Sequence, residues 1–228
     1  MSLFAIGDTH LSLSSSKPMD IFRGWQDYTA RLEKNWRAVV CDADTVCIPG
    51  DISWAMRPDD AVRDLLFLNG LPGRKIIGKG NHDYWWCTMA KLGELKEKYG
   101  LDKIDFLFNN AYEVGEYAVC GTRGWFFDAE SDDVTKVLAR EAGRLRRSIE
   151  AALALEKKPL VFLHYPVCYD GRQCSELIAV LKEYGIDRCW FGHIHGDTSG
   201  RYLKYEQDGI NYHLISADAL GFMPKLIL

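Results

Sequence analysis

The chain has 228 residues, of which 47% are hydrophobic and 26% are charged. This composition is typical of a globular domain with an ample core, and it excludes a disordered or fibrous chain. The formal net charge of -4 provides no general basic field, so nucleic acid is not an expected partner.

The start of the chain and its cysteines bear on the compartment. The first residues run directly into a predicted strand, without the charged and apolar regions of a signal peptide. No apolar run approaches the roughly 20 residues that a membrane-spanning helix needs. The seven cysteines form no Cys-x-x-Cys pair, and their odd number favours reduced thiols. We therefore expect a cytoplasmic protein without membrane contact.

Short apolar runs predict buried strands, and longer runs with helical spacing predict helices. The predicted strands cover residues 3–6, 45–48, 74–77, 106–108, 112–114, 117–120, 160–163, 188–191, 201–205 and 210–215. The predicted helices are one that carries Trp25 to Val39, one from Pro58 to near Gly70, one that begins at Tyr84, one over 134–153 and one over 175–184. Asp208-Gly209 predicts a tight hairpin between the last two strands. We expect a single α/β domain over residues 1–228, with two mixed β-sheets packed face to face and helices outside.

Polar side chains gather directly after five of the predicted strands. In chain order the motifs are Asp8-Thr9-His10, Gly50-Asp51, Gly80-Asn81-His82-Asp83, His164-Tyr165 and Gly192-His193-Ile194-His195. Side chains two residues apart in an extended chain point the same way, so Asp8/His10 and His193/His195 should each direct two groups to one point. Because ligands bind at the carboxyl ends of strands in α/β sheets, we expect the motifs to converge at one edge of a sheet.

Each motif taken singly has a plainer interpretation. A glycine turn capped by Asn81 or Asp83 would explain residues 78–83. A lone His-x-His is commonly a chance surface pair. The ordered set is more specific, because oxygen and imidazole ligands without thiolate suit Mn, Fe, Zn or a similar divalent ion. The set therefore predicts a metal site.

With these five motifs in this order, the sequence resembles the calcineurin-like metallophosphoesterases over most of its length. The resemblance implies the same fold of two packed sheets flanked by helices. It implies one metal ion held by Asp8, His10, Asp51 and His195. It implies a second ion held by Asp51, Asn81, His164 and His193, so that Asp51 bridges the two.

The resemblance also implies a reaction. The protein would be a metal-dependent phosphoesterase, with a hydroxide between two divalent ions attacking phosphorus. His82 would be the catalytic histidine that gives a proton to the leaving oxygen, and Asp83 would be its orienting partner.

The expected partner is a small organic or nucleotide phosphoester. Arg123, between glycines after a predicted strand, is a candidate phosphate contact, and a structural ion pair is the alternative. Trp54, Trp85, Trp86 and Trp125 lie within reach of the strand ends that carry the motifs and are candidates for an aromatic wall. Core packing is the alternative, and it is favoured for Trp86. Preference for monoesters or diesters, the metal identity and the oligomeric state stay open.

Two other functions fit the same motifs. The first is a Mn-dependent nuclease of this family, against which the acidic charge argues. The second is a metal-binding interaction module that has lost catalysis, against which the complete set of motifs argues.

Overall fold

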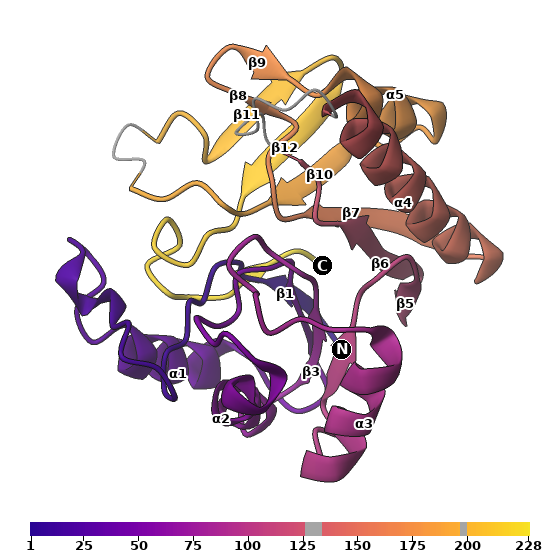
Figure 1. The fold of residues 1–228 in the computed structure, drawn as a ribbon. Helices are drawn as coiled ribbons and strands as arrows, with labels where there is room; N and C mark the ends of the chain where they lie inside the picture. Colours follow the sequence, from indigo (N-terminus) through magenta and orange to yellow (C-terminus); the bar gives the residue numbers. More distant parts are fainter. Residues whose placement is uncertain (126–133, 197–199) are drawn as a thin grey trace.

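The computed structural model describes residues 1–125, 134–196 and 200–228. Two mixed β-sheets lie at its centre, and helices cover the outer side of each (Figure 1). The α/β sandwich that the sequence predicts is therefore confirmed. None of the helices in these three ranges combines the length and the apolarity that a bilayer span requires.

The first sheet has five strands in the order β13-β1-β2-β3-β4. Their bounds are β13 (Lys225–Leu226), β1 (Leu3–Ala5), β2 (Thr45–Ile48), β3 (Arg74–Ile77) and β4 (Ile104–Phe106). Strands β1 to β4 are parallel, and β13 joins β1 antiparallel. The helices α1 (Tyr28–Val39), α2 (Pro58–Asn69) and α3 (Met89–Tyr99) connect these strands, and a short 3-10 helix, η1 (Met19–Ile21), precedes α1.

The second sheet has six strands in the order β11-β12-β10-β7-β6-β5. Their bounds are β11 (Lys204–Gln207), β12 (Ile210–Leu214), β10 (Arg188–Phe191), β7 (Lys158–Leu163), β6 (Tyr117–Thr122) and β5 (Ala111–Val114). The helices α4 (Val134–Ala154) and α5 (Ser175–Glu183) lie on its outer side (Figure 1). A small hairpin of β8 (Cys168–Tyr169) and β9 (Arg172–Gln173) follows β7.

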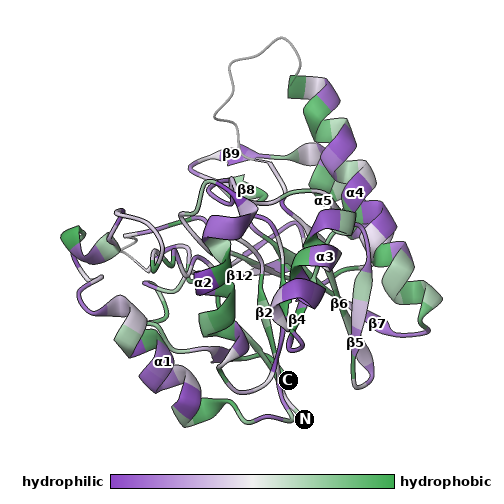
Figure 2. Ribbon diagram, turned by 60° about the horizontal axis from the view of Figure 1, so that its bottom comes forward, coloured by the Kyte–Doolittle hydropathy of each residue, from purple (hydrophilic) through white to green (hydrophobic). Residues whose placement is uncertain are grey.

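The central strands are apolar on both faces because each sheet lies between two layers, whereas the edge strands β5 and β11 are partly exposed. In β7, Leu160 and Phe162 pack between the sheets, whereas Val161 and Leu163 pack under α4 and α5. This alternation follows the two-residue period of a strand. Figure 2 shows that the outer helices, in contrast, carry both hydrophilic and hydrophobic residues.

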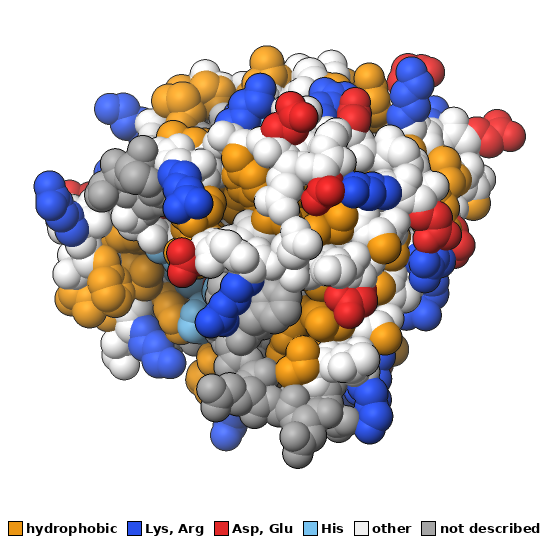
Figure 3. Space-filling model, turned by 90° about the horizontal axis from the view of Figure 1, so that it is seen from above, with side chains coloured by type: hydrophobic (Ala, Val, Ile, Leu, Met, Phe, Trp, Pro, Cys, Tyr) orange, Lys and Arg blue, Asp and Glu red, His pale blue; other side chains and the backbone are white. Residues whose placement is uncertain are grey.

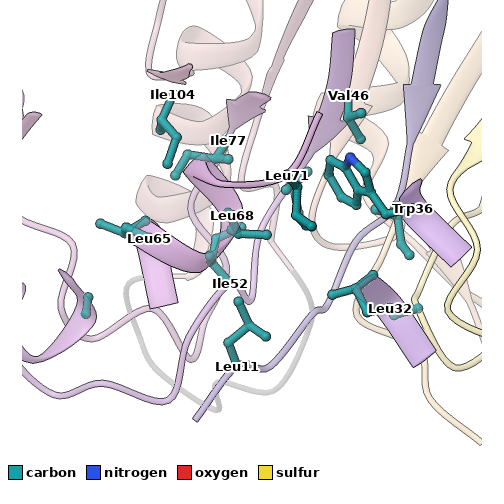
Figure 4. Close-up of a cluster of buried hydrophobic side chains, with 14 of the residues drawn as sticks. Leu11, Leu32, Trp36, Val46, Ile52, Leu65, Leu68, Leu71, Ile77 and Ile104 are labelled. Carbon is teal, nitrogen blue, oxygen red and sulfur yellow. The ribbon is translucent and has the colours of Figure 1, made fainter. Parts of the chain in front are cut away.

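The outer core of the first sheet lies under α1 and α2. Figure 4 shows part of this cluster, in which side chains of both helices lie with side chains of the sheet and of the loops beside it. The labelled residues are Leu11, Leu32, Trp36, Val46, Ile52, Leu65, Leu68, Leu71, Ile77 and Ile104. This packing holds the carboxyl ends of β1, β2 and β3 in fixed positions relative to one another.

Two predicted helix starts are wrong. Helix α3 begins at Met89, not Tyr84, because the preceding segment buries Trp85 and Trp86 in the core before Thr88 caps the helix. Helix α1 begins at Tyr28, so Trp25 lies before it and not within it. There Asp27 has a left-handed φ of 52°, which interrupts the helical conformation.

Two predicted strands are shifted. Strand β4 lies two residues earlier than expected, because Ile104 and Phe106 are buried while Asp105 pairs with Arg74 and Lys96. Strand β11 starts at Lys204, since the two-residue turn at Asp208 and Gly209 sets a register in which Gln207 faces Ile210. Both turn residues have positive φ, 57° and 77°, as the predicted tight hairpin requires.

Candidate metal centre

Five loops meet at the carboxyl ends of strands from both sheets. The loops after β1, β2 and β3 leave the first sheet, and those after β7 and β10 leave the second. The expected convergence at one edge of a single sheet is therefore wrong. The two sheets are linked here by hydrogen bonds between the loop after β10 and the loop after β1. The backbone N–H of His193 donates to both carboxylate oxygens of Asp8, at 2.9 and 3.0 Å.

The loops bring two groups of possible metal ligands together. In each group, one ligand atom per residue lies within 4.8 Å of the others. The first group is Asp8, His10 and His195, and the second is Asp51, His164 and His193. Asn81 lies beside the second group, with its Oδ1 atom 2.6 Å from Nε2 of His164.

The carboxylate of Asp51 lies between the two groups. Its Oδ2 atom is 3.6 Å from Nε2 of His10 and 3.5 Å from Nε2 of His164. This oxygen is buried and has no hydrogen-bond partner in the structure, whereas Oδ1 accepts the backbone N–H of His82 at 2.8 Å. A buried oxygen without a partner is costly unless a cation is bound there. Oδ2 is thus placed to contact ions in both groups.

The electrostatics of the site also fit a bound cation. Burial lowers the pKa of His10 and of His164 well below the usual range of an imidazole, so both rings are neutral and carry free lone pairs. Burial and the nearby charges of Asp83 and Asp8 raise the pKa of Asp51. Neutral imidazoles and crowded carboxylates are ligands that a divalent ion prefers, so these residues fit a metal.

The backbone at the site is unusual. Four of the grouped residues have left-handed φ angles, which are uncommon outside glycine and cluster at functional sites. The angles are 57° for Asp8, 43° for His10, 51° for Asp51 and 70° for His193. Since the chain is not extended here, side chains two residues apart do not always point to the same group. Asp8 and His10 do share a group, but His193 and His195 belong to different groups.

Two glycines allow carboxylates to approach the backbone closely. A Cβ atom at Gly80 would lie 2.1 Å from Oδ1 of Asp51, and a Cβ atom at Gly192 would lie 2.2 Å from Oδ2 of Asp8. Either contact would displace a carboxylate from its group. Glycine at both positions is therefore a condition for the site.

His82 and Asp83 lie at the site but do not form the expected pair. The ring of His82 is 4.4 Å from that of Trp54, and its Nδ1 atom is buried without a hydrogen-bond partner. The carboxylate of Asp83 instead accepts four N–H groups, at 2.7 to 3.2 Å, from Ile52, Ser53, Gly80 and Trp85. A fully buried carboxylate needs such donors, so Asp83 stabilises the loops that carry Asp51 and His82.

Asp218 is a site residue that lies outside the five sequence motifs. Its Oδ1 atom lies 2.9 Å from Nδ1 of His195, and its Oδ2 atom accepts the backbone N–H of Gly196 at 2.9 Å. A signal was present, since Asp218 follows shortly after the predicted strand 210–215, as the other site carboxylates follow their strands. It is not a member of either group, and it contacts the site through His195.

The residues that the sequence predicts as substrate contacts differ in their burial. Trp54 is half-buried and stacks on His10, with ring centroids 5.0 Å apart and an angle of 23° between the planes. Arg123 is half-buried, and its carbonyl accepts the N–H of His164 at 3.2 Å. Its guanidinium lies 5.1 Å from the ring of Trp125. Trp85 is fully buried, so it is a core residue and cannot form part of an aromatic wall.

Figure 3 looks onto the molecule from above. A histidine side chain is visible in a hollow, beside hydrophobic, lysine or arginine, and acidic side chains. The side chain of His195, in the first ligand group, is 30% exposed, so the centre is open to solvent.

The fold and the paired groups together define an α/β protein with a candidate centre for two metal ions. A family model described as calcineurin-like phosphoesterase matches residues 1–197. The chain belongs to the calcineurin-like phosphoesterase family. A search of curated proteins found no match.

Solved structures share the fold at low sequence identity. The phosphopantetheinyl hydrolase of Mycobacterium tuberculosis is 14% identical, with a TM-score of 0.52 over 100% of this chain and 95% of that chain. A protein of unknown function from Aquifex aeolicus is also 14% identical, with a TM-score of 0.51 over 99% of this chain and 95% of that chain. These similarities concern the fold alone.

Proposed function

We propose that this protein is a phosphohydrolase that uses two divalent metal ions to cleave small organic or nucleotide phosphoesters. The observation that carries the proposal is the unpartnered Oδ2 atom of Asp51, which lies between His10 of one group and His164 of the other. A shared carboxylate offsets the repulsion between two ions and suits the separation of about 3.5–4 Å found in two-metal phosphoryl chemistry. Membership of a phosphoesterase family supports the reaction type.

In this proposal, each of the two ligand groups binds one metal ion. Asp8, His10, Asp51 and His195 would hold one ion, and Asp51, Asn81, His164 and His193 would hold the other. Mn, Fe and Zn all suit this mixture of oxygen and imidazole ligands. When bound, the two ions supply Lewis acidity toward the phosphoryl oxygens and a water that is nucleophilic near neutral pH.

His82 is the proton donor in this proposal. It lies beside the first group, with its ring centroid 5.6 Å from that of His10. Burial and the neighbouring charges of His195 and Lys17 lower its pKa. A phosphoryl dianion close to the ring has the opposite effect and favours the imidazolium that a proton donor requires. Asp83 takes part indirectly, since it stabilises the loop that presents His82.

Arg123 and Trp54 are the substrate contacts in this proposal. The guanidinium of Arg123 has a buried Nε atom without a hydrogen-bond partner, so it can donate to a phosphoryl oxygen. The half-buried face of Trp54, next to His82, suits a flat or apolar leaving group. We therefore propose that aryl and nucleoside phosphoesters are cleaved at least as well as sugar phosphates.

The test is to strip the protein of metal, reload it separately with Mn, Fe or Zn, and assay a panel of aryl and nucleoside phosphomonoesters and phosphodiesters. The expected result is hydrolysis that depends on metal and is lost in Asp51→Asn. Metal binding without turnover of any phosphoester would instead indicate an interaction module. Nicking of plasmid DNA without turnover of small substrates would indicate a nuclease.

A further inference from the structure

A cavity of about 680 Å³ lies outside the two metal-ligand groups. Its lining comes from the segment after β3, the start of α3, the turn between β4 and β5, the end of β6, and α4. Its volume is in the range of small-molecule sites. No role in metal binding or proton transfer accounts for it.

The walls of this cavity are strongly basic. Four cationic residues line it, namely Lys79, Lys91, Arg123 and Arg144, and none of the described lining residues is acidic. Glu141, which does not line the cavity, pairs with Arg144 and also accepts the hydroxyl of Thr122 at 2.9 Å. Asp83 also interacts electrostatically with Lys79. Among the described residues, the four cations of the lining still outnumber these two carboxylates, in a protein whose formal net charge is -4. Such a local excess of positive charge favours an anion.

The remainder of the lining is largely apolar. Trp86, Leu107 and Phe108 contribute rings and methyl groups, and Phe108 is 37% exposed. The guanidinium of Arg144 lies 5.8 Å from the ring of Phe108, so charged and apolar surfaces adjoin. A ligand for this cavity should carry both an anionic group and an organic part.

The cavity is next to the second ligand group. Lys79 lies two residues before Asn81, and the carbonyl of Arg123 accepts the backbone N–H of His164 at 3.2 Å. The loop after β3 and the segment after β6 therefore line the cavity and also lie beside Asn81 and His164 of the metal centre.

We propose that this cavity is a second anion subsite, which binds a further phosphate on the organic part of the substrate while the first phosphate lies at the metal centre. The inference rests on the proposed phosphohydrolase function and narrows its substrate class to organic molecules with two separate phosphate groups. Lys79, Lys91 and Arg144 bind the distal phosphate, whereas Arg123 stays the contact of the first phosphate. Trp86 and Phe108 contact the organic part between the two phosphates.

The experiment compares α,ω-alkanediol bisphosphates of increasing chain length with alkyl monophosphates of the same length. The metal-loaded protein should show a higher kcat/KM for the bisphosphate, with a maximum at the length that spans centre and cavity. Lys91→Gln should reduce the ratio of the two kcat/KM values by about tenfold, the size of one lost charge-assisted hydrogen bond. Lys79→Gln should reduce the same ratio.

The matched control is Lys98→Gln. Lys98 is exposed on the same helix as Lys91, but it does not line the cavity and instead lies 3.9 Å from Asp59. A wild-type protein without preference for bisphosphates would overturn the inference. Equal ratios in Lys91→Gln and Lys98→Gln would also overturn it.

The two kinds of substrate test the subsite and the phosphohydrolase activity independently. Hydrolysis of monophosphates without any preference for bisphosphates removes the subsite and leaves the phosphohydrolase. If neither compound is hydrolysed, the proposed function fails, and calorimetric binding of the bisphosphates decides the subsite alone. Binding that is weakened by Lys91→Gln but not by Lys98→Gln supports it, and binding that is equal in both variants contradicts it.

Discussion

The Nδ1 atom of His195 lies 2.9 Å from the Oδ1 atom of Asp218, 23 residues further along the chain. This bond favours the tautomer with the proton on Nδ1, which leaves the lone pair on Nε2. That atom faces the first ligand group, at 3.1 Å from Nε2 of His10 and 3.7 Å from Oδ1 of Asp8. Asp218 thus orients His195 as second partners of metal-binding histidines commonly do.

Replacing Asp218 should weaken metal binding. We expect Asp218→Ala to lower the affinity of the first group by about 10–100-fold, the usual effect of losing such an orienting contact. Asp218→Asn should restore part of this loss, because its side-chain oxygen accepts the same hydrogen bond. Competition with a chelator measures the affinity. Asp208→Ala, which removes an exposed carboxylate paired with Lys182, is the control, and an equal effect in both alanine variants would contradict the role.

Asp51→Asn should lower the occupancy of both metal positions. A neutral amide does not offset the repulsion between two cations as a carboxylate does, and Oδ2 of Asp51 lies 3.6 Å from Nε2 of His10 and 3.5 Å from Nε2 of His164. Metal analysis after gel filtration gives the number of ions per chain. Asp105→Asn, which alters a carboxylate of the same sheet that pairs with Arg74 and Lys96, should keep both ions. Two ions and full activity in Asp51→Asn would rule out bridging.

His82→Ala should retain the metals and lose roughly 10²–10⁴-fold in turnover, the typical contribution of a general acid. The defect should be smaller for nitrophenolate than for alkyl leaving groups, because a leaving group of low pKa needs no proton. His213→Ala, a histidine outside both groups, serves as the control. The same loss for both kinds of leaving group would show that His82 binds substrate or metal instead.

The two tryptophans Trp54 and Trp85 should respond differently to alanine. Trp54 is half-buried against His10 and His82, so Trp54→Ala should raise KM for aryl esters and leave folding intact. Trp85 is fully buried, so Trp85→Ala should lower the free energy of unfolding by about 3–5 kcal/mol, as large core truncations do. Kinetics and urea denaturation distinguish the two. A purely destabilising effect of Trp54→Ala would remove it from the substrate site.

The free energy of unfolding should fall as the pH is lowered, in part because the folded protein resists protonation of His213. Burial, followed by the charges of Lys225, Lys204 and Arg188, lowers the pKa of His213 to about 4. The unfolded chain, with a pKa near 6.5, therefore binds more protons than the folded protein below that pH. The free energy of unfolding decreases as the pH falls from about 6.5 to about 4, by about 1–2 kcal/mol once solvent screening of this half-buried ring is included.

Urea denaturation of the wild type and of His213→Gln measures this effect. At neutral pH the imidazole is neutral in both folded and unfolded states, so the variant's difference there reports packing alone. As the pH is lowered, the wild type should lose more free energy of unfolding than His213→Gln. Any advantage in stability that the wild type has at neutral pH should therefore shrink to zero or reverse. Parallel pH profiles for the two proteins would contradict the assigned pKa.

Much of the site could be predicted from the sequence because its chemistry is local. The apolar runs at 45–48, 74–77 and 188–191 match β2, β3 and β10, and the motifs after β2 and β10 contain Asp51, His193 and His195 of the two ligand groups. A buried strand needs consecutive apolar residues, and a metal needs particular donor atoms, so both leave a direct signal in the amino-acid order.

Only the tertiary structure decided how these pieces combine. The choice of sheet for each strand, the separation of His193 from His195, the backbone partners of Asp83 and the contact between His195 and Asp218 all depend on long-range packing. The same holds for the basic cavity, whose lysines and arginines come from four separate segments. Strand pairing and left-handed backbone conformations are selected by the burial and hydrogen bonding of the whole molecule, because no short stretch of sequence contains both partners of these contacts.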